Sequence, residues 1–307
     1  MPPRLVVGLT NFGDFLPDGE WGRLVEVATA AEAAGIGAVS LVDHVVLGGD
    51  LGDYPYGSFP GGPEDPWLEP LTTLAAFAGA TDRIGLMTAI LIAPLRPPAL
   101  LAKAAATLDQ ISGGRLELGV GTGWQAKEYE AAGLSFADRG RLLDAAIDAC
   151  RELWRPGPTE LSCGCLSLSD VYCSPQPRRP GGVPFWVAGR LHPRNLERVV
   201  RRGDGWIPSP SAPAAEVAEG AARLRAACAE AGRDPASLRV RIAVAPRREE
   251  GGATEVGSTF RNLPAILEST GATDVFVAHA AFSSRYDGRE EELFGRLATD
   301  FAAVAGG

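Results

Sequence analysis

Two histidines follow short apolar segments of the kind that form buried strands, where an imidazole could move protons for a reaction. His44, preceded by Asp43, comes directly after residues 38–42, and His279 comes after residues 274–278. The reference pKa of imidazole, about 6.5, suits it to proton transfer near neutral pH. We predict His44 as a catalytic residue, Asp43 as a cofactor contact and His279 as a substrate contact. The alternative for His44 is a histidine that only hydrogen-bonds a loop.

Two turns that contain glycine are suited to holding an anion. One follows the apolar residues 116–120, and the other lies between residues 184–188 and a helical segment that begins near Pro193. Glycine lets a backbone approach a ligand closely, and free N–H groups at a turn or helix start attract negative charge. The first turn lacks the G-x-G-x-x-G spacing and follows a fourth strand, which argues against a dinucleotide-binding loop. The predicted cofactor contacts here are Gly121, Thr122, Gly123, Ala188, Gly189 and Arg190. The alternative for the arginine is an ordinary solvated side chain.

A flat apolar surface and loop aromatics are the other features expected beside a ligand. The third strand ends in small or β-branched residues that could lie flat against a ring system, which we predict as cofactor contacts: Thr88, Ala89 and Ile90. Aromatic residues on loops often close over apolar ligands. On this ground we predict three substrate contacts: Tyr54, Tyr56 and Trp124. Ordinary packing in the barrel or at its rim is the alternative for both groups. The long loop 47–67 is expected to act as a lid.

A cysteine cluster is the remaining motif that could do chemistry. Cys163, Cys165 and Cys173 lie close together in the sequence, but a zinc site needs a fourth ligand and a more regular spacing. We therefore predict no metal. The five cysteines form an odd set without a secretory context, which favours a reducing, cytoplasmic location.

Short apolar segments alternate with longer amphipathic ones along the chain, which is typical of a parallel α/β fold. The expected strands are residues 5–9, 38–42, 84–91, 116–120, 184–188, 205–207, 238–244 and 274–278. The expected helices are residues 21–34, 68–79, 98–111, 138–154, 193–201, 214–231, 263–269 and 290–304. Eight such units predict a (β/α)8 TIM barrel, formed by a single domain over residues 1–307, with insertions after strands two and four. The second insertion, residues 155–183, is expected to be irregular.

An open, doubly wound sheet is the competing fold, but no Rossmann fingerprint follows the first strand. In a closed barrel the active site lies at the carboxyl ends of the strands. The histidines and the two turns all follow predicted strands, so the barrel predicts that they gather at one mouth.

Composition limits the class of partner. Of the 307 residues, 46% are hydrophobic and 22% are charged, as in ordinary globular proteins. The net charge of −9 argues against nucleic acid or an anionic membrane as the main partner, although local basic loops can still bind an anionic ligand. We see no signal peptide and no apolar run of membrane-spanning length. A small-molecule substrate is therefore expected.

Several segments resemble the luciferase-like monooxygenase superfamily, and within it the actinobacterial branch that uses coenzyme F420. They include DHVV at 43–46, WLEPLTTL at 67–74, TDRI at 81–84, SGGR at 112–115, GVGTGW at 119–124, RGR at 139–141 and GDGW at 203–206. The resemblance covers about residues 5–210. It implies a (β/α)8 barrel with an isoalloxazine or deazaflavin ring in its mouth, and a homodimer.

The same resemblance implies roles for individual residues. A non-proline cis bond is expected near Ala89-Ile90, the two glycine turns would hold the ribityl and phosphate part of the cofactor, and His44 would lie near the reactive ring. The chain departs from F420-dependent sugar-phosphate dehydrogenases at two places. Trp124 stands where those enzymes carry an acidic residue, and Val45-Val46-Leu47 follows the histidine where they carry a tryptophan. These departures argue against sugar-phosphate oxidation.

Three functions follow from these observations. The leading hypothesis is an F420-dependent oxidoreductase that transfers a hydride between the deazaflavin and a small organic substrate. The second is an FMN-dependent monooxygenase that uses reduced flavin and oxygen, with a separate flavin reductase as a possible partner. The third is a non-catalytic flavin-binding protein.

Overall fold

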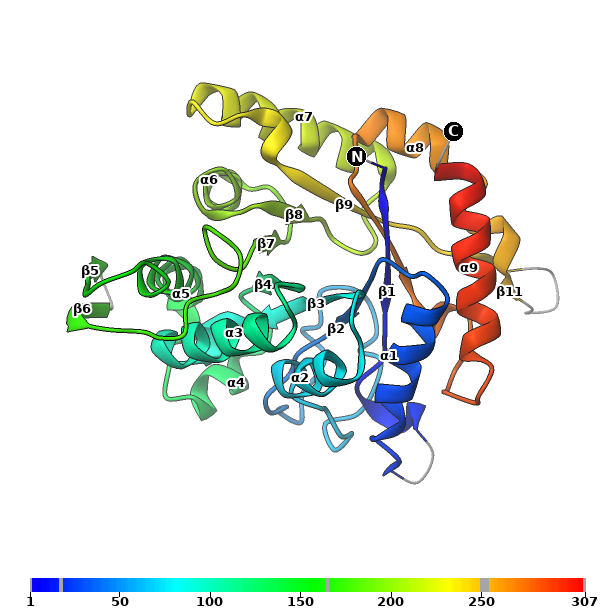
Figure 1. Cartoon of the computed structure of the whole chain (residues 1–307), viewed down its shortest axis with the longest axis horizontal. Coiled ribbons are helices and arrows are strands. Elements are labelled where there is room, and N and C mark those ends of the chain that lie inside the picture. The colour runs from blue at the N-terminus through cyan, green and yellow to red at the C-terminus, as the bar shows by residue number, and fades with distance from the viewer. Residues whose placement is uncertain (1, 17–18, 164–165, 249–253, 306–307) are drawn as a thin grey trace.

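The computed structural model describes residues 2–16, 19–163, 166–248 and 254–305. Parallel strands close into a barrel in the order β1-β12-β9-β8-β7-β4-β3-β2, and helices surround it (Figure 1). The barrel strands are β1 Arg4–Gly8, β2 Ala38–Leu41, β3 Gly85–Ile92, β4 Leu116–Gly121, β7 Phe185–Ala188, β8 Gly205–Ile207, β9 Arg239–Ala243 and β12 Asp274–Ala278. The closed parallel barrel confirms the predicted fold class.

The outer helices alternate with the barrel strands along the chain. They are α1 Arg23–Ala33, α2 Pro70–Ala80, α3 Pro98–Ile111, α5 Arg139–Leu153, α6 Pro193–Arg202, α7 Ala214–Glu230, α8 Leu263–Thr270 and α9 Glu290–Ala305. Local sequence accounts for several of their ends. Pro98 begins α3, where the missing N–H costs nothing, and Gly113 follows the helix with a φ of 71°. Among the described residues, no helix combines the length and apolar character needed to cross a membrane.

The barrel has a hydrophobic outer layer and a filled interior. Outward-facing strand residues pack against the helices, whereas a smaller cluster fills the middle of the barrel: Val6, Ala38, Met87, Trp186 and Ile207. At the amino-terminal ends of the strands, Arg4 and Arg239 each bind both Glu117 and Asp274 over 2.7–3.0 Å. We call these four charged residues the ionic plug. Because the plug fills this end, only the carboxyl end of the barrel is open to a ligand.

The ionic plug also explains the charge state of its carboxylates. Burial alone would raise the pKa of Glu117, but the adjacent charges of Arg4 and Arg239 outweigh burial and lower that pKa to about 2. The carboxylate is therefore ionised throughout the ordinary pH range, although it lies inside the barrel.

The structure corrects some expectations about the connections. Residues 155–183 are not wholly irregular, because β5 Thr159–Cys163 and β6 Leu166–Val171 pair as an antiparallel hairpin. The short helix α4 Ala126–Ala131 and the two-residue strands β10 Arg247–Arg248 and β11 Thr254–Glu255 were not predicted. Cys173 is a buried free thiol, and Cys165 lies outside the described residues. The described part of the chain contains no group of His, Cys, Asp and Glu side chains that could hold a metal.

Candidate active site

A cavity of about 300 Å³ opens at the carboxyl ends of the barrel strands, and we call it the central cavity. Residues from β3, β4, β7 and the loop after β2 line it. It brings together most of the residues predicted from sequence: Asp43, His44, Tyr54, Tyr56, Ala89, Ile90, Gly121, Thr122, Gly123, Trp124, Ala188 and Gly189. Parallel strands place their carboxyl ends at one rim, so side chains far apart in sequence meet there.

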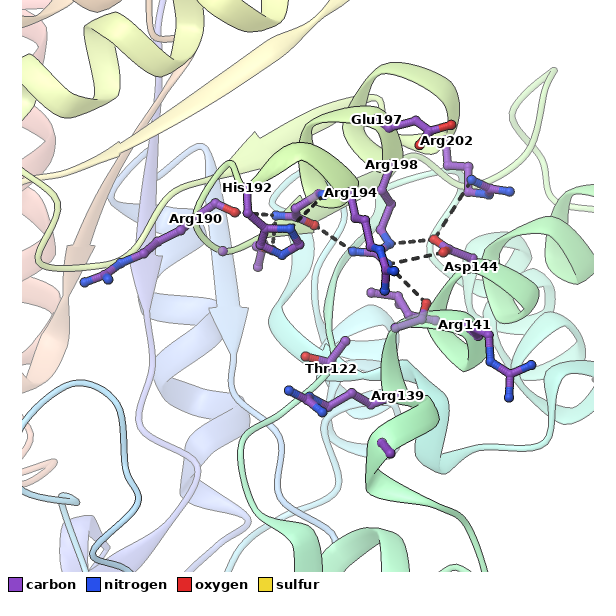
Figure 2. Close-up of a pocket in the computed structure, with 16 residues that line it drawn as sticks. Thr122, Arg139, Arg141, Asp144, Arg190, His192, Arg194, Glu197, Arg198 and Arg202 are labelled. Atoms are coloured by element: carbon purple, nitrogen blue, oxygen red, sulfur yellow. Dashed lines mark hydrogen bonds and ion pairs between the residues drawn. The ribbon is translucent and has the colours of Figure 1, made fainter.

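A second, larger pocket of about 710 Å³ adjoins the central cavity and shares Thr122, Ala188 and Gly189 with it. We call it the arginine pocket. It lies between the start of α5 and the start of α6 (Figure 2), and its basic lining residues are Arg139, Arg141, Arg190, Arg194, Arg198 and Arg202. The site thus has two adjoining compartments: the central cavity, which is mainly apolar, and the arginine pocket, which is cationic.

The catalytic histidine predicted from sequence is held by a carboxylate. Nδ1 of His44 lies 3.1 Å from Oε2 of Glu128 on α4, and the backbone N–H of Val45 donates to Oε1 of the same carboxylate at 2.9 Å. The Glu128 side chain is fully buried. An ionised carboxylate only accepts hydrogen bonds, so Nδ1 carries a proton and donates it. Glu128 therefore fixes the orientation of the ring and leaves Nε2 as the nitrogen available to the cavity.

Aromatic side chains surround this histidine. The His44 ring makes edge contacts with Trp67 at 4.7 Å, with Phe59 at 5.5 Å and with Trp124 at 5.9 Å between ring centres. Tyr54 packs on Trp124 at 5.4 Å. Burial in this cluster raises the pKa of Tyr54, so its hydroxyl stays protonated. Phe59 and Trp67 from the loop after β2, together with Trp124 after β4, thus form an aromatic roof over the central cavity.

Asp43, predicted as a cofactor contact, lines the central cavity and also binds other groups of the protein. Its carboxylate is buried, accepts the backbone N–H of Ile92 at 2.8 Å and pairs with Arg96 through two bonds of 2.7 and 3.0 Å. Both oxygen atoms of the Asp43 carboxylate thus accept hydrogen bonds from Ile92 or Arg96. These bonds to Ile92 and Arg96 hold the end of β3 in place beside the cavity.

The wall that Asp43 positions carries the expected cis bond. The peptide bond Ala89-Ile90 is cis, at a register irregularity between Thr88 and Leu91. A Cβ atom placed on Gly121 would lie 2.9 Å from Cδ1 of Ile90, so the glycine lets the Ile90 side chain pack closely against β4. The result is a flat surface formed by small or backbone groups of β3 and β4.

Two predicted contacts, Thr88 and His279, line neither the central cavity nor the arginine pocket, and the structure corrects both. Thr88 is fully buried and donates its hydroxyl to the carbonyl oxygen of Gly119 at 2.8 Å. His279 is packed against Phe15 and Tyr286, and burial lowers its pKa to about 4. Sequence position at a strand end indicated the correct height in the barrel, but it did not determine which way each side chain points.

The turn after β7 is built as an anion site. Gly189 has a φ of 107°, which favours glycine, and Asn195 donates to the carbonyl oxygens of Ala188 and Arg190 at 3.1 Å. Helix α6 begins directly after this turn, so its N-terminus faces the arginine pocket. Figure 2 shows the Arg190 side chain directed away from Arg194 and Arg198. Its charge acts on Tyr56, on the side of the central cavity.

The arginines of the arginine pocket are not equally neutralised. Arg198 pairs with Asp144 at 2.5 Å, and Arg202 pairs with Asp148 at 2.7 Å. By contrast, Arg194 is exposed and forms no ion pair with any described carboxylate. The pocket therefore presents free positive charge to a ligand.

Several residues of the site were missed by sequence reasoning. Glu128 and Tyr129 lie on the short helix α4, and the Tyr129 hydroxyl holds the carbonyl oxygen of Thr122 at 2.6 Å. No local pattern indicated that helix. Arg241 also borders the central cavity, and here a signal existed. Strand β9 alternates arginine and apolar residues, and a charged residue that faces the barrel interior is costly unless it has a partner.

Fold and site together define a (β/α)8 barrel with an aromatic cavity at its mouth and a cationic pocket beside it. Residues 5–251 match the sequence profile of the luciferase-like monooxygenase family. The chain belongs to this family, which confirms the predicted superfamily and the expectation of an oxidoreductase.

Two relatives and one solved structure illustrate the likeness. An uncharacterized protein of Mycobacterium tuberculosis is 31% identical over 65% of this chain and 66% of its own length. The pyrimidine monooxygenase RutA of Allorhizobium ampelinum is 28% identical over 79% of this chain and 69% of its own length. The chain thus spans about two thirds of these relatives. The structure of an F420-dependent secondary alcohol dehydrogenase with an F420–acetone adduct superposes with a TM-score of 0.77 at 16% identity, covering 98% of this chain and 99% of the other.

Proposed function

We propose that this protein is an F420-dependent oxidoreductase that transfers a hydride between the deazaflavin and a small organic substrate. The observation that carries the proposal is the arginine pocket joined to the central cavity through Thr122, Ala188 and Gly189. F420 joins its ring to a phosphodiester and a tail of glutamates, whereas FMN ends in a single phosphate. A large pocket with free arginines suits the longer and more highly charged tail.

The residues of the central cavity fit a tricyclic ring. The wall at Ala89-Ile90 and Gly121 is flat and apolar, and two buried indole N–H groups on cavity residues, Trp67 Nε1 and Trp124 Nε1, have no hydrogen-bond partner among the described residues. Buried donors without partners are costly. Ring carbonyl oxygens of a flavin or deazaflavin are suitable acceptors for them.

When bound, the deazaflavin supplies the hydride transfer. The protein supplies the proton relay and excludes water. Nε2 of His44 would take or give the substrate proton, because Glu128 holds Nδ1 and stabilises the positive charge that the ring acquires. The aromatic roof of Phe59, Trp67 and Trp124 shields this nitrogen from bulk water.

Titration of the purified protein with F420 and with FMN, followed by cofactor fluorescence, tests this proposal. We expect saturable F420 binding with at least tenfold preference over FMN. Arg194→Met should weaken F420 binding and leave riboflavin binding unchanged, because riboflavin has the ring without a phosphate. Saturable binding of FMN alone would reject F420 as the cofactor.

An FMN-dependent monooxygenase is the second candidate, and the similarity to RutA favours it. This reaction needs reduced flavin, so a separate reductase would be a partner. Deazaflavins react poorly with oxygen, and oxygen consumption with reduced FMN therefore separates the two candidates. For either reaction we expect a homodimer acting in the cytoplasm.

A further inference from the structure

The central cavity is lined by a buried cation, Arg241, that forms no ion pair with any described carboxylate. Arg241 lies on β9, is 5% exposed and stacks on the Phe276 ring at 4.5 Å. Its Nη1 atom is buried and has no hydrogen-bond partner, and its side chain forms no ion pair with any described residue. Burial lowers the pKa of Arg241 to about 10, so it remains charged at neutral pH.

The two carboxylates inside the barrel, one of which, Asp274, acts on Arg241 through its charge, already accept hydrogen bonds from other donors. Glu117 accepts from Arg4, Arg239 and the Trp186 indole over 2.7–3.0 Å. Asp274 accepts from the same two arginines and from the adjacent Thr273 hydroxyl. The two carboxylates of the ionic plug are equal in number to Arg4 and Arg239. The charge of Asp274 also acts on Arg241, but no carboxylate among the described residues forms an ion pair with it, so Arg241 is a positive charge in excess inside the barrel.

The strand order places Arg241 opposite the flat wall. Counted from strand to neighbouring strand around the closed barrel, β9 and β3 are four strands apart in either direction, so they lie on opposite sides of it. The flat wall at Ala89-Ile90 belongs to β3, so a ring lying against it leaves Arg241 on the far side of the cavity. Its nearer neighbours in the lining, Ile207, Pro208 and Pro210, are apolar and offer it no counter-charge.

We propose that Arg241 is a substrate-binding residue that pairs with an anionic oxygen, and that the substrate therefore carries a carboxylate. This assignment of substrate class deepens the proposed function and rests on it for the reaction, but the binding itself needs no cofactor. A guanidinium presents several N–H groups in a plane, and a carboxylate matches that geometry. The anionic edge of a reduced flavin or deazaflavin ring has similar chemistry, and the experiment below separates the two sources.

Benzoate and benzamide are suitable probes, because they share a planar ring and differ in charge. Isothermal titration of the cofactor-free protein should show benzoate binding about 10- to 100-fold more tightly than benzamide, which is the range expected for a charge-assisted hydrogen bond. Arg241→Met should abolish this preference, and Arg241→Lys should keep part of it. Arg223→Met, which removes an exposed arginine of α7, is the matched control and should behave as wild type.

Thermal unfolding distinguishes ligand binding from a structural role. Removing an uncompensated buried charge should leave the melting temperature of the cofactor-free protein unchanged or raise it, whereas a structural arginine would lower it on removal. Benzoate should raise the melting temperature of the wild type and not that of Arg241→Met. Equal binding of benzoate and benzamide by the wild type overturns the proposal.

A cofactor titration of Arg241→Met completes the test. Affinity for F420 and FMN should stay within about twofold of the wild-type value. If it falls tenfold or more, the anionic group belongs to the cofactor and the substrate assignment is wrong. Because benzoate binding is measured without cofactor, failure of the F420 proposal would not affect the result for Arg241.

Discussion

Replacing Asp43 with asparagine tests whether this residue mainly positions the end of β3 or contacts the cofactor, as expected from sequence. The substitution keeps the size of the side chain and retains an acceptor for the Ile92 N–H, but it removes the charge that binds Arg96 at 2.7 and 3.0 Å. The Asp43 carboxylate is fully buried and Arg96 is 12% exposed, so water replaces little of the lost interaction. Arg96 keeps its second partner, Glu69.

The expected cost follows from these contacts. Breaking a buried ion pair costs about 3–5 kcal/mol, and the remaining Glu69 partner and conserved shape reduce the estimate to about 2–3 kcal/mol. With an unfolding entropy of about 2.1 cal/mol/K per residue, 307 residues give about 0.6 kcal/mol/K, so the melting temperature should fall by about 3–5 °C.

Urea denaturation and thermal scans of Asp43→Asn, Arg96→Met and the double variant form the assay. The double variant should lose less than the sum of the single variants, because both substitutions remove the same pair. If Asp43 mainly positions β3, Asp43→Asn should lose stability, whereas its affinity for the cofactor should change much less than the loss of a direct contact would cause. Unchanged stability together with a tenfold or greater loss of cofactor affinity would refute the positioning role and restore the contact predicted from sequence.

Three further outcomes are expected. His44→Ala should lower kcat/KM by about 10²–10⁴ while cofactor affinity, measured by fluorescence, stays near the wild-type value; unchanged turnover would remove His44 from the mechanism. Glu128→Gln keeps the acceptor for His44 but removes the negative charge, so kcat should fall by at least tenfold without loss of the folded state in circular dichroism. The pKa of Glu117, lowered from 4.5 to about 2, makes its ionisation favour the folded state above pH 4.5. That stabilisation, about 3 kcal/mol, should be lost as the pH falls through 2 in acid unfolding, and Glu117→Gln should flatten the dependence.

Local sequence predicted the elements of the barrel closely where physical signals are short-range. The expected helix 98–111 and strand 274–278 agree with α3 and β12 because proline and glycine mark the helix ends and an apolar run marks the strand. The hairpin β5–β6 was missed, because its partly exposed strands lack a continuous apolar pattern. Helix α4, with only six residues, is too short for periodicity to reveal it.

Sequence alone determined the barrel and the level at which the site lies, because strand ends can be read from local pattern and parallel strands share one open rim. Only the tertiary structure decided what each side chain binds. Asp43 is committed to Arg96, 53 positions away, and His44 to Glu128, 84 positions away, whereas Nη1 of Arg241 is buried without a hydrogen-bond partner among the described residues. Such pairings depend on how distant strands and loops approach one another, and a one-dimensional pattern carries no information about that distance.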